Sequence, residues 1–305
     1  MFDIGSMAYL CAEMNERYRI YIMAAKPSLL HVAAVCRAVE SLGACVVSCC
    51  RVQGASDPCV ELTVCFAGAK SMLLKTLLPL ARQYPLLLRV CRNEERVESI
   101  GLVAFDLDSV LVRTEMMNEL AARCGCSHEM TYLTELAMSG QEEFADNFRR
   151  RVSMLRGLPL AEVKAMAQAL PIAEGVSALK HSLSVRGVRT AIITGGFRQF
   201  SQSVQDQYGF DYICTSEAEV VDGVLTGALS GAIVDAETKA ACLRQLSIAL
   251  SLSPDRVAAV GDGANDLSML DYAGESIIFN TSTHGATVPQ LRIDAVSTIL
   301  SIGDN

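Results

Sequence analysis

The chain has 305 residues, of which 51% are hydrophobic and 20% are charged, and its formal net charge at pH 7 is −8. This composition is typical of a globular protein and excludes a largely disordered chain. The negative charge argues against nucleic acid as a partner, because the phosphate backbone binds basic surfaces.

The N-terminus and the cysteines indicate a cytoplasmic protein. Residues 1–17 contain neither a basic leader nor a long apolar run, and no stretch reaches the roughly 18–20 apolar residues that a membrane span needs. The 12 cysteines are scattered through apolar segments, so we expect reduced thiols in the core rather than disulfides. Cys124, Cys126 and His128 lie close together, but the sequence offers no second pair of ligands to complete a zinc site.

The first 92 residues are predicted to alternate between short strands and helices. The strands are expected at Arg19–Ala24, Ala44–Cys50, Val60–Phe66 and Leu86–Val90, and the helices from Pro27 to about Gly43 and over Ser71–Gln83. The order β-α-β-β-α-β predicts a ferredoxin-like α+β domain at 1–92. This order resembles the ACT family of amino-acid-sensing domains, which implies a regulatory role and a homodimer. A plain dimerisation module fits the same pattern.

Strand, loop and helix alternate again in the second domain, at 93–305. The charged stretch Arg92–Ser99 is interpreted as the linker. The strands are predicted at Gly101–Phe105, Thr190–Ile193, Tyr212–Cys214, Val257–Val260 and Ser276–Ile278. This α/β pattern is typical of a doubly wound parallel sheet. A helical insertion at about 115–180 follows the first of these strands and is expected to form a cap.

Two acidic residues end the first strand of this sheet. Asp106 and Asp108 lie two residues apart, at the edge where open α/β sheets bind ligands. By themselves they are a weak signal, because aspartate commonly ends a strand as a turn former.

Three later segments add complementary chemistry. In chain order they contain Thr194, Gly195 and Gly196, then Lys239, then Asp262, Asn265 and Asp266. The glycines let backbone N–H groups close on an anion, whereas the lysine alone would pass for an exposed helix residue. Acids, an anion-binding loop and a cation together suit the transfer of a phosphoryl group with the help of a hard metal ion.

In this order the four segments resemble the motifs of the haloacid dehalogenase superfamily, and residues 101–303 resemble its phosphoserine phosphatase family. Beyond the superfamily motifs, the resemblance rests on Glu115, Met138, the segment 144–151, the Thr-Gly-Gly-Phe loop and the Gly-Asp-Gly-Ala-Asn-Asp run. It implies a haloacid dehalogenase-like core and a Mg²⁺-dependent phosphatase that hydrolyses O-phosphoserine, the last step of serine biosynthesis.

The resemblance also implies a role for each residue. Asp106 would be the nucleophile, and Asp108 would protonate the leaving serine oxygen and then activate water. Lys239 would complete the catalytic set. Mg²⁺ would be held by Asp106, the main-chain carbonyl of Asp108, Asp262 and Asp266. The substrate would be bound by Glu115, Met138, Phe144, Arg151, Thr194, Gly195, Gly196 and Asn265.

Two positions depart from the commonest pattern of that family. Val110 stands in place of a threonine and Thr194 in place of a serine, which affects the expected rate more than the reaction type. Two alternatives stay open. One is the same chemistry on another phosphomonoester, or transfer to an acceptor such as homoserine, and the other is a catalytically weak amino-acid sensor.

Overall fold

The computed structural model describes residues 16–281 and 291–302, apart from 27, 54–56 and 93–98. The N-terminal elements are β1 (Glu16–Met23), α2 (Leu29–Glu40), β2 (Cys45–Val52), β3 (Cys59–Phe66), α3 (Lys70–Gln83) and β4 (Leu87–Arg92). Their strands are all antiparallel, in the order β2-β3-β1-β4. The predicted order β-α-β-β-α-β is confirmed, whereas Pro27 and most of the predicted linker lie outside the described residues.

A parallel sheet follows, as the sequence predicts. Its strands are β5 (Leu102–Phe105), β6 (Arg189–Phe197), β7 (Tyr212–Ser216), β10 (Val257–Gly261) and β11 (Glu275–Phe279), in the order β11-β10-β5-β6-β7. The helices that cover it are α8 (Val176–Val185), α9 (Arg198–Tyr208), α10 (Ala236–Ala249), α11 (Leu267–Tyr272) and α12 (Ala295–Ser301).

Alternate residues of β5 point to opposite faces of the sheet and so enter two cores. Val103 and Phe105 pack with apolar residues of α8, α9 and α12. Leu102 and Ala104 pack with residues of α10 and α11, and this second core continues to α2 and α3 of the N-terminal part. The buried runs on both faces explain why these strands are almost continuously apolar.

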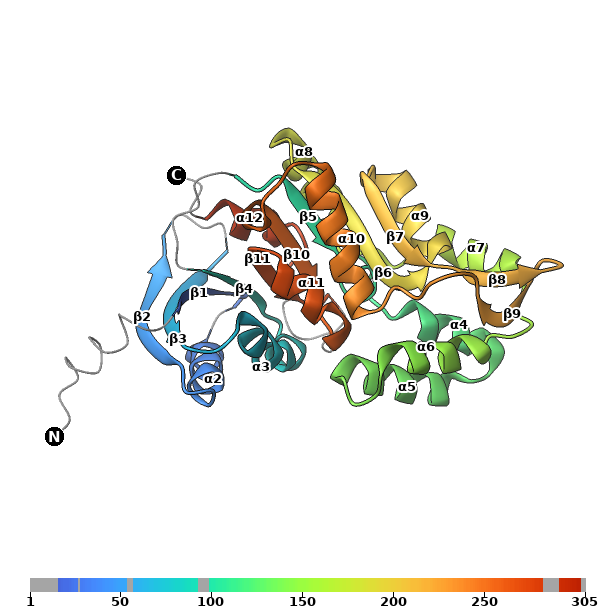
Figure 1. Ribbon diagram of the computed structural model, residues 1–305, viewed down its shortest axis with the longest axis horizontal. Helices are drawn as coiled ribbons and strands as arrows, with labels where there is room; N and C mark the ends of the chain where they lie inside the picture. The colour runs from blue at the N-terminus through green and yellow to red at the C-terminus, as the bar shows by residue number, and fades with distance from the viewer. Residues whose placement is uncertain (1–15, 27, 54–56, 93–98, 282–290, 303–305) are drawn as a thin grey trace.

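The two parts of the chain share one sheet. Strand β4 pairs antiparallel with β11, with Val90 opposite Ser276 and Leu87 opposite Phe279. The result is a single nine-stranded sheet in the order β2-β3-β1-β4-β11-β10-β5-β6-β7. Figure 1 shows the N-terminal elements directly beside β11 and α11. Main-chain pairing and a common core therefore join the two parts, which the sequence did not predict.

Four helices and a hairpin lie at the end of the molecule far from β2 (Figure 1). The helices α4 (Met116–Cys124), α5 (Ser127–Ser139), α6 (Phe144–Ser153) and α7 (Leu160–Gln168) follow β5. The unpredicted hairpin consists of β8 (Ala218–Val221) and β9 (Val224–Leu229). It is tied to the segment after α6, because Leu225 exchanges main-chain hydrogen bonds with Gly157 and Leu158. The described helices include none that is both long and apolar enough to cross a membrane.

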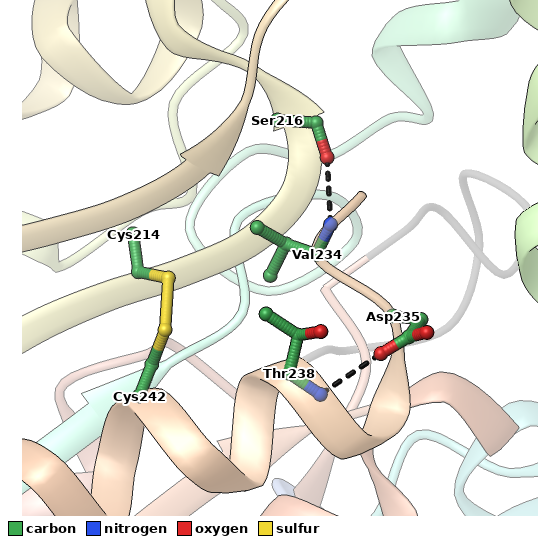
Figure 2. Close-up of a disulfide and its surroundings, with 6 residues drawn as sticks. All are labelled: Cys214, Ser216, Val234, Asp235, Thr238 and Cys242. Carbon is green, nitrogen blue, oxygen red and sulfur yellow. Dashed lines mark hydrogen bonds between the residues drawn. A yellow bond between two sulfur atoms is a disulfide. The ribbon is translucent and has the colours of Figure 1, made fainter. Parts of the chain in front are cut away.

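The expectation that all cysteines are reduced and buried was wrong in two respects. Cys214 on β7 forms a disulfide with Cys242 on α10 (Figure 2). The helix packs beside the strand, and the connecting segment is held by the Ser216 hydroxyl, which accepts a hydrogen bond from the Val234 N–H at 2.9 Å. Three free cysteines, at 45, 49 and 50, lie exposed on the outer strand β2. The spacing of the cysteines in the sequence indicates neither which of them pair nor which are exposed.

Candidate active site

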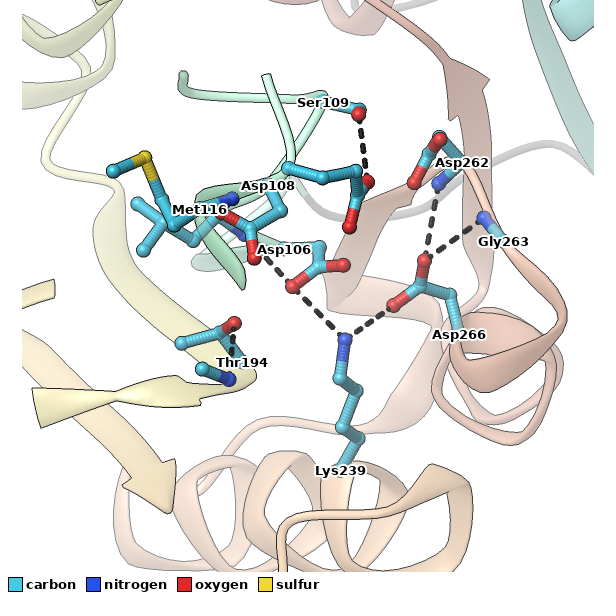
Figure 3. Close-up of polar contacts among 12 residues, drawn as sticks. Asp106, Asp108, Ser109, Met116, Thr194, Lys239, Asp262, Gly263 and Asp266 are labelled. Atoms are coloured by element: carbon cyan, nitrogen blue, oxygen red, sulfur yellow. Dashed lines mark hydrogen bonds and ion pairs between the residues drawn. The ribbon is translucent and has the colours of Figure 1, made fainter. Parts of the chain in front are cut away.

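The candidate catalytic side chains meet at the carboxyl edge of the parallel sheet. Asp106 follows β5, Thr194 lies near the end of β6, and Asp262 follows β10. Because β10, β5 and β6 are parallel neighbours, their ends bring these residues together (Figure 3). Lys239 joins them from the first turn of α10, a helix that is capped by the side chain of Asp235.

Lys239 lies between two carboxylates. Its Nζ is 2.9 Å from Asp106 Oδ1 and 2.8 Å from Asp266 Oδ1, and all three side chains are at most 4% exposed. Burial alone would lower the pKa of Lys239, but the charges of the two aspartates raise it, so the ammonium stays charged. Burial and the charge of Asp266 raise the pKa of Asp106 to about 7, against the opposing effect of Lys239. A buried cation thus lies beside the residue expected to be the nucleophile.

Three carboxylates are placed to hold a metal ion. One oxygen from each of Asp106, Asp262 and Asp266 lies within 4.8 Å of the other two, and all three residues are buried. Asp262 Oδ1 is buried without a hydrogen-bond partner among the described residues. Such an oxygen is costly unless a cation or water binds it. Carboxylate oxygens are the ligands of hard divalent ions, so the residues present fit Mg²⁺.

Asp266 also organises the loop that follows β10. Its Oδ2 accepts hydrogen bonds from the N–H groups of Asp262, at 3.0 Å, and Gly263, at 3.1 Å, while its Oδ1 accepts from Lys239. Both of its oxygens therefore have donors within the protein. This arrangement suits Asp266 to holding the loop and the lysine in place, in support of the two other carboxylates.

Asp108 and Glu115 form an acidic pair beside these three carboxylates. Both are half-buried. Burial, followed by the charges of Glu115 and Asp106, raises the pKa of Asp108 well above its ordinary value. The Met116 N–H donates to Asp108 Oδ1 at 3.4 Å (Figure 3). The Ser109 hydroxyl donates to Glu115 Oε1 at 2.8 Å. A carboxyl group whose pKa is raised keeps its proton to higher pH than an ordinary aspartate, which suits a general acid.

A small, partly open cavity lies over these residues. It is lined by Asp106, Asp108, Glu115, Met117, Phe144, Phe148, Arg151, Thr194, Gly195, Gly196 and Asn265. Asn265 Oδ1 is buried in its wall without a hydrogen-bond partner among the described residues. The backbone of Met138 lies in α5, but its side chain is outside the described part of the structure. The cavity therefore combines acids at one side with an arginine and aromatic rings contributed by α6.

Arg151 is held rigidly in the wall of this cavity. It is 4% exposed, and its Nε donates to Asn147 Oδ1 at 2.8 Å. Its guanidinium carbon lies 5.7 Å from the Phe144 ring centre and 5.2 Å from that of Phe148. Phe144 in turn reaches the end of β6, because a Cβ built on Gly195 would lie 2.8 Å from Phe144 Cζ. Helix α6 and the end of β6 thus touch across the cavity, and the glycines that were expected in a loop belong to the strand.

The sequence analysis did not name four contributors as site residues. Met117 and Phe148 line the cavity, while Asn280 and Arg82 donate hydrogen bonds to Asp262. Asn280 directly follows β11, so the rule that polar residues at strand ends form the site would have found it. Arg82 lies on α3 of the N-terminal part, where no local pattern indicates a function.

Comparisons with known proteins identify the family of this chain and several relatives. Residues 103–271 match the family model of haloacid dehalogenase-like hydrolases. The chain is 38% identical over 179 residues to a phosphoserine phosphatase of Archaeoglobus fulgidus, which covers 59% of this chain and 52% of that relative. It is 38% identical over 182 residues to a phosphoserine phosphatase of Idiomarina loihiensis, which covers 60% and 83% of the two chains.

A solved structure of a phosphoserine phosphatase has a similar fold. A phosphoserine phosphatase with an analogue of its phospho-aspartyl intermediate superimposes with a TM-score of 0.56 at 33% identity, over 58% of this chain and 85% of the other. The chain spans about half the length of the Archaeoglobus relative and most of the length of the Idiomarina one. The match of the family model over more than half of its residues shows that this chain belongs to the haloacid dehalogenase-like hydrolase family.

Proposed function

We propose that the chain is a Mg²⁺-dependent phosphatase that hydrolyses O-phosphoserine through an aspartyl-phosphate on Asp106. Asp106 lines a cavity that also presents Asp108 and Arg151, and behind it Asp106 contacts the buried Lys239; this observation carries the proposal. Nucleophile, general acid and charge-stabilising groups thus converge on one small volume. The relatives named phosphoserine phosphatase supply independent support.

The proposed reaction has two half-reactions. A carboxylate oxygen of Asp106 attacks phosphorus, the bond from phosphorus to the serine oxygen breaks, and Asp108 gives its proton to that oxygen. Asp108, now ionised, takes a proton from the water that attacks phosphorus; the bond from phosphorus to the Asp106 oxygen breaks, which restores the Asp106 carboxylate and releases phosphate. Lys239 and the groups of Thr194, Gly195, Gly196 and Asn265 would bind the phosphoryl oxygens.

In this proposal, different residues bind the metal ion and the amino-acid end of the substrate. Mg²⁺ would be held by Asp106, Asp262 and the main-chain carbonyl of Asp108, with Asp266 in support, and would neutralise charge on the phosphoryl oxygens. Glu115 would bind the serine ammonium. Arg151 would bind the carboxylate, because a guanidinium can donate two parallel hydrogen bonds to it.

The proposal is tested by phosphate release from a panel of phosphomonoesters, with and without alcohol acceptors such as homoserine. We expect O-phosphoserine to give the highest kcat/KM and the acceptors to leave phosphate release unchanged. A higher kcat/KM for another ester would refute phosphoserine as the substrate. A phosphorylated acceptor as the main product would refute hydrolysis as the reaction. No turnover of any ester would favour the amino-acid sensor.

A cytoplasmic homodimer, formed through residues 1–92, is the proposed assembly. The nine free thiols among the described cysteines support a reducing location. Within the described residues, β2 has β3 as its one neighbour, and its Val47 is 54% exposed. An open edge with apolar side chains is a pairing surface. Light scattering should give a dimer that Val47→Lys weakens, and a monomeric wild type would refute it.

A further inference from the structure

Arg82 connects the N-terminal part of the molecule to the carboxylates of the candidate metal site. From the end of α3, its Nε donates to the main-chain carbonyl of Asp262 at 3.1 Å, and its Nη2 lies 3.4 Å from Asp262 Oδ2. The aspartate side chain is 1% exposed and the arginine side chain 32% exposed. We propose that Arg82 is a positioning residue that holds Asp262 ready to bind the metal, an inference that rests on the proposed metal site.

The two oxygens of Asp262 have different surroundings. Oδ2 accepts from Asn280 Nδ2 at 2.6 Å and faces Arg82, whereas Oδ1 is buried without a partner among the described residues. The donors therefore fix one oxygen and the backbone, and leave the other oxygen buried without a donor among the described residues. Arg82 itself is outside the set of described side chains that line the substrate cavity. Its effect is thus directed at the ligand and not at the substrate.

Helix α3 is well placed to hold Arg82 in this position. At its other end, Lys70 Nζ donates to the main-chain carbonyl of Ala273, the residue that caps α11. Between these polar anchors, Leu73, Leu74 and Leu77 are fully buried in the core that α3 shares with α10 and α11. Helix α11 directly follows the loop that contains Asp262 and Asp266. Through Arg82 and Lys70, α3 therefore binds both ends of the segment formed by this loop and α11.

This arrangement makes metal binding depend on a residue some 180 positions away in the sequence. Residues that orient a metal ligand typically change metal affinity or activity by roughly 10–100-fold when they are removed. Part of that effect would come from the two-point geometry of the guanidinium, which a lysine cannot reproduce. The N-terminal part would then contribute to the site without touching the substrate.

The test is calorimetric titration of Mg²⁺ into the full chain. We expect Arg82→Met to raise the Kd for Mg²⁺ by roughly 10-fold or more, and Arg82→Lys to restore part of the loss. Lys75→Met is the matched control, because it removes one positive charge from an exposed position of the same helix. At saturating Mg²⁺ the KM for phosphoserine should be the same in all variants.

Failure of the role of Arg82 and failure of the proposed substrate give different results in this experiment. A folded Arg82→Met chain that binds Mg²⁺ as wild type does, or an equal loss in Lys75→Met, would overturn the role of Arg82. If Arg82→Met does not fold, the Arg82→Lys variant decides, since wild-type affinity there refutes the need for two-point contact. Normal Mg²⁺ binding without hydrolysis of phosphoserine would refute the substrate but leave the role of Arg82 standing. A wild-type chain that does not bind Mg²⁺ would overturn both.

Discussion

Asp106 and Asp108 lie two residues apart in sequence but have different surroundings. Asp106 Oδ1 accepts from Lys239 and from the Leu107 N–H, so a cation and a backbone amide favour its charged form. Asp108 has the half-buried Glu115 as a like-charged neighbour, and its pKa is raised by burial and by that charge. Different surroundings are what allow neighbouring carboxyl groups to serve as nucleophile and as acid.

Replacing Asp106 with asparagine tests the first of these roles. The amide has the same shape but cannot attack phosphorus, so phosphatase activity should fall by at least roughly 10³-fold. Burial and shape are kept, so the circular dichroism spectrum should match wild type. Activity near the wild-type level in a preparation shown by mass spectrometry to be free of deamidation would rule out Asp106 as the nucleophile.

Replacing Asp108 with asparagine tests proton transfer. We expect kcat for phosphoserine to fall by roughly 10²–10⁴-fold. Since p-nitrophenolate leaves without needing a proton, kcat/KM for p-nitrophenyl phosphate should fall much less. In wild type, the raised pKa of Asp108 keeps the acid protonated at higher pH, so kcat/KM for phosphoserine should decline only as pH rises through that pKa. Equal losses for the two substrates would contradict the assignment.

At the scale of elements, the disulfide between β7 and α10 secures the helix that carries Lys239. Its two cysteines are 28 residues apart. In the chain-entropy description, closing a loop of this length stabilises the fold by roughly 3–4 kcal/mol. Urea unfolding of wild type should therefore shift to lower midpoint with dithiothreitol, and Cys242→Ser should show the low midpoint in both conditions. A wild-type midpoint that is insensitive to reductant would mean that the thiols are already reduced.

Asp211 ties the start of β6 to β7. Burial alone would raise its pKa, but hydrogen bonds from Arg189, Thr190 and Lys180 lower it to about 2. A pKa below that of the unfolded chain stabilises the fold above about pH 4, and this contribution is lost as pH falls toward 2. We expect Asp211→Asn to destabilise the protein by about 2 kcal/mol at neutral pH and by progressively less in acid. A loss independent of pH would show that the charge is not responsible.

The strands and the site could be predicted because each leaves a local pattern. Apolar runs that end in Asp106, Thr194 and Asp262 mark both the strands and the edge where they meet. The pairing of β4 with β11 leaves no such pattern, since a strand buried on both faces looks the same whichever neighbour it has. The hairpin of β8 and β9 was missed because its residues are largely exposed and its strands are short.

At the scale of the whole molecule, a buried ion pair joins the two parts of the sheet. Arg89 on β4 makes two hydrogen bonds to the Glu275 carboxylate on β11, at 2.6 and 2.9 Å, and is 2% exposed. It also donates to the main-chain carbonyls of Ile299 and Ile302. Removing residues 1–92 would expose the edge of β11 and leave this carboxylate without its arginine. A chain that starts near residue 98 is therefore expected to be unstable, although the proposed catalytic residues all follow it.

A double-mutant comparison measures this junction in the full chain. Arg89→Met should lower the free energy of unfolding by roughly 3–5 kcal/mol, because it removes the guanidinium that neutralises the buried Glu275 carboxylate. Arg89→Met combined with Glu275→Leu should recover much of that loss. Denaturant unfolding provides the measurement. A small effect of the single change would mean that the two parts are only weakly coupled through this pair.

The central claim, an aspartyl-phosphate on Asp106, is tested most directly by trapping it. The full chain is mixed with ³²P-labelled phosphoserine and Mg²⁺, quenched in acid within a turnover, and digested for mass spectrometry. We predict one labelled peptide, with the phosphoryl group on Asp106 and lost on treatment with hydroxylamine, and no label in the Asp106→Asn variant. A wild-type enzyme that turns over phosphoserine while the label is found on another residue, or on none, would contradict the account.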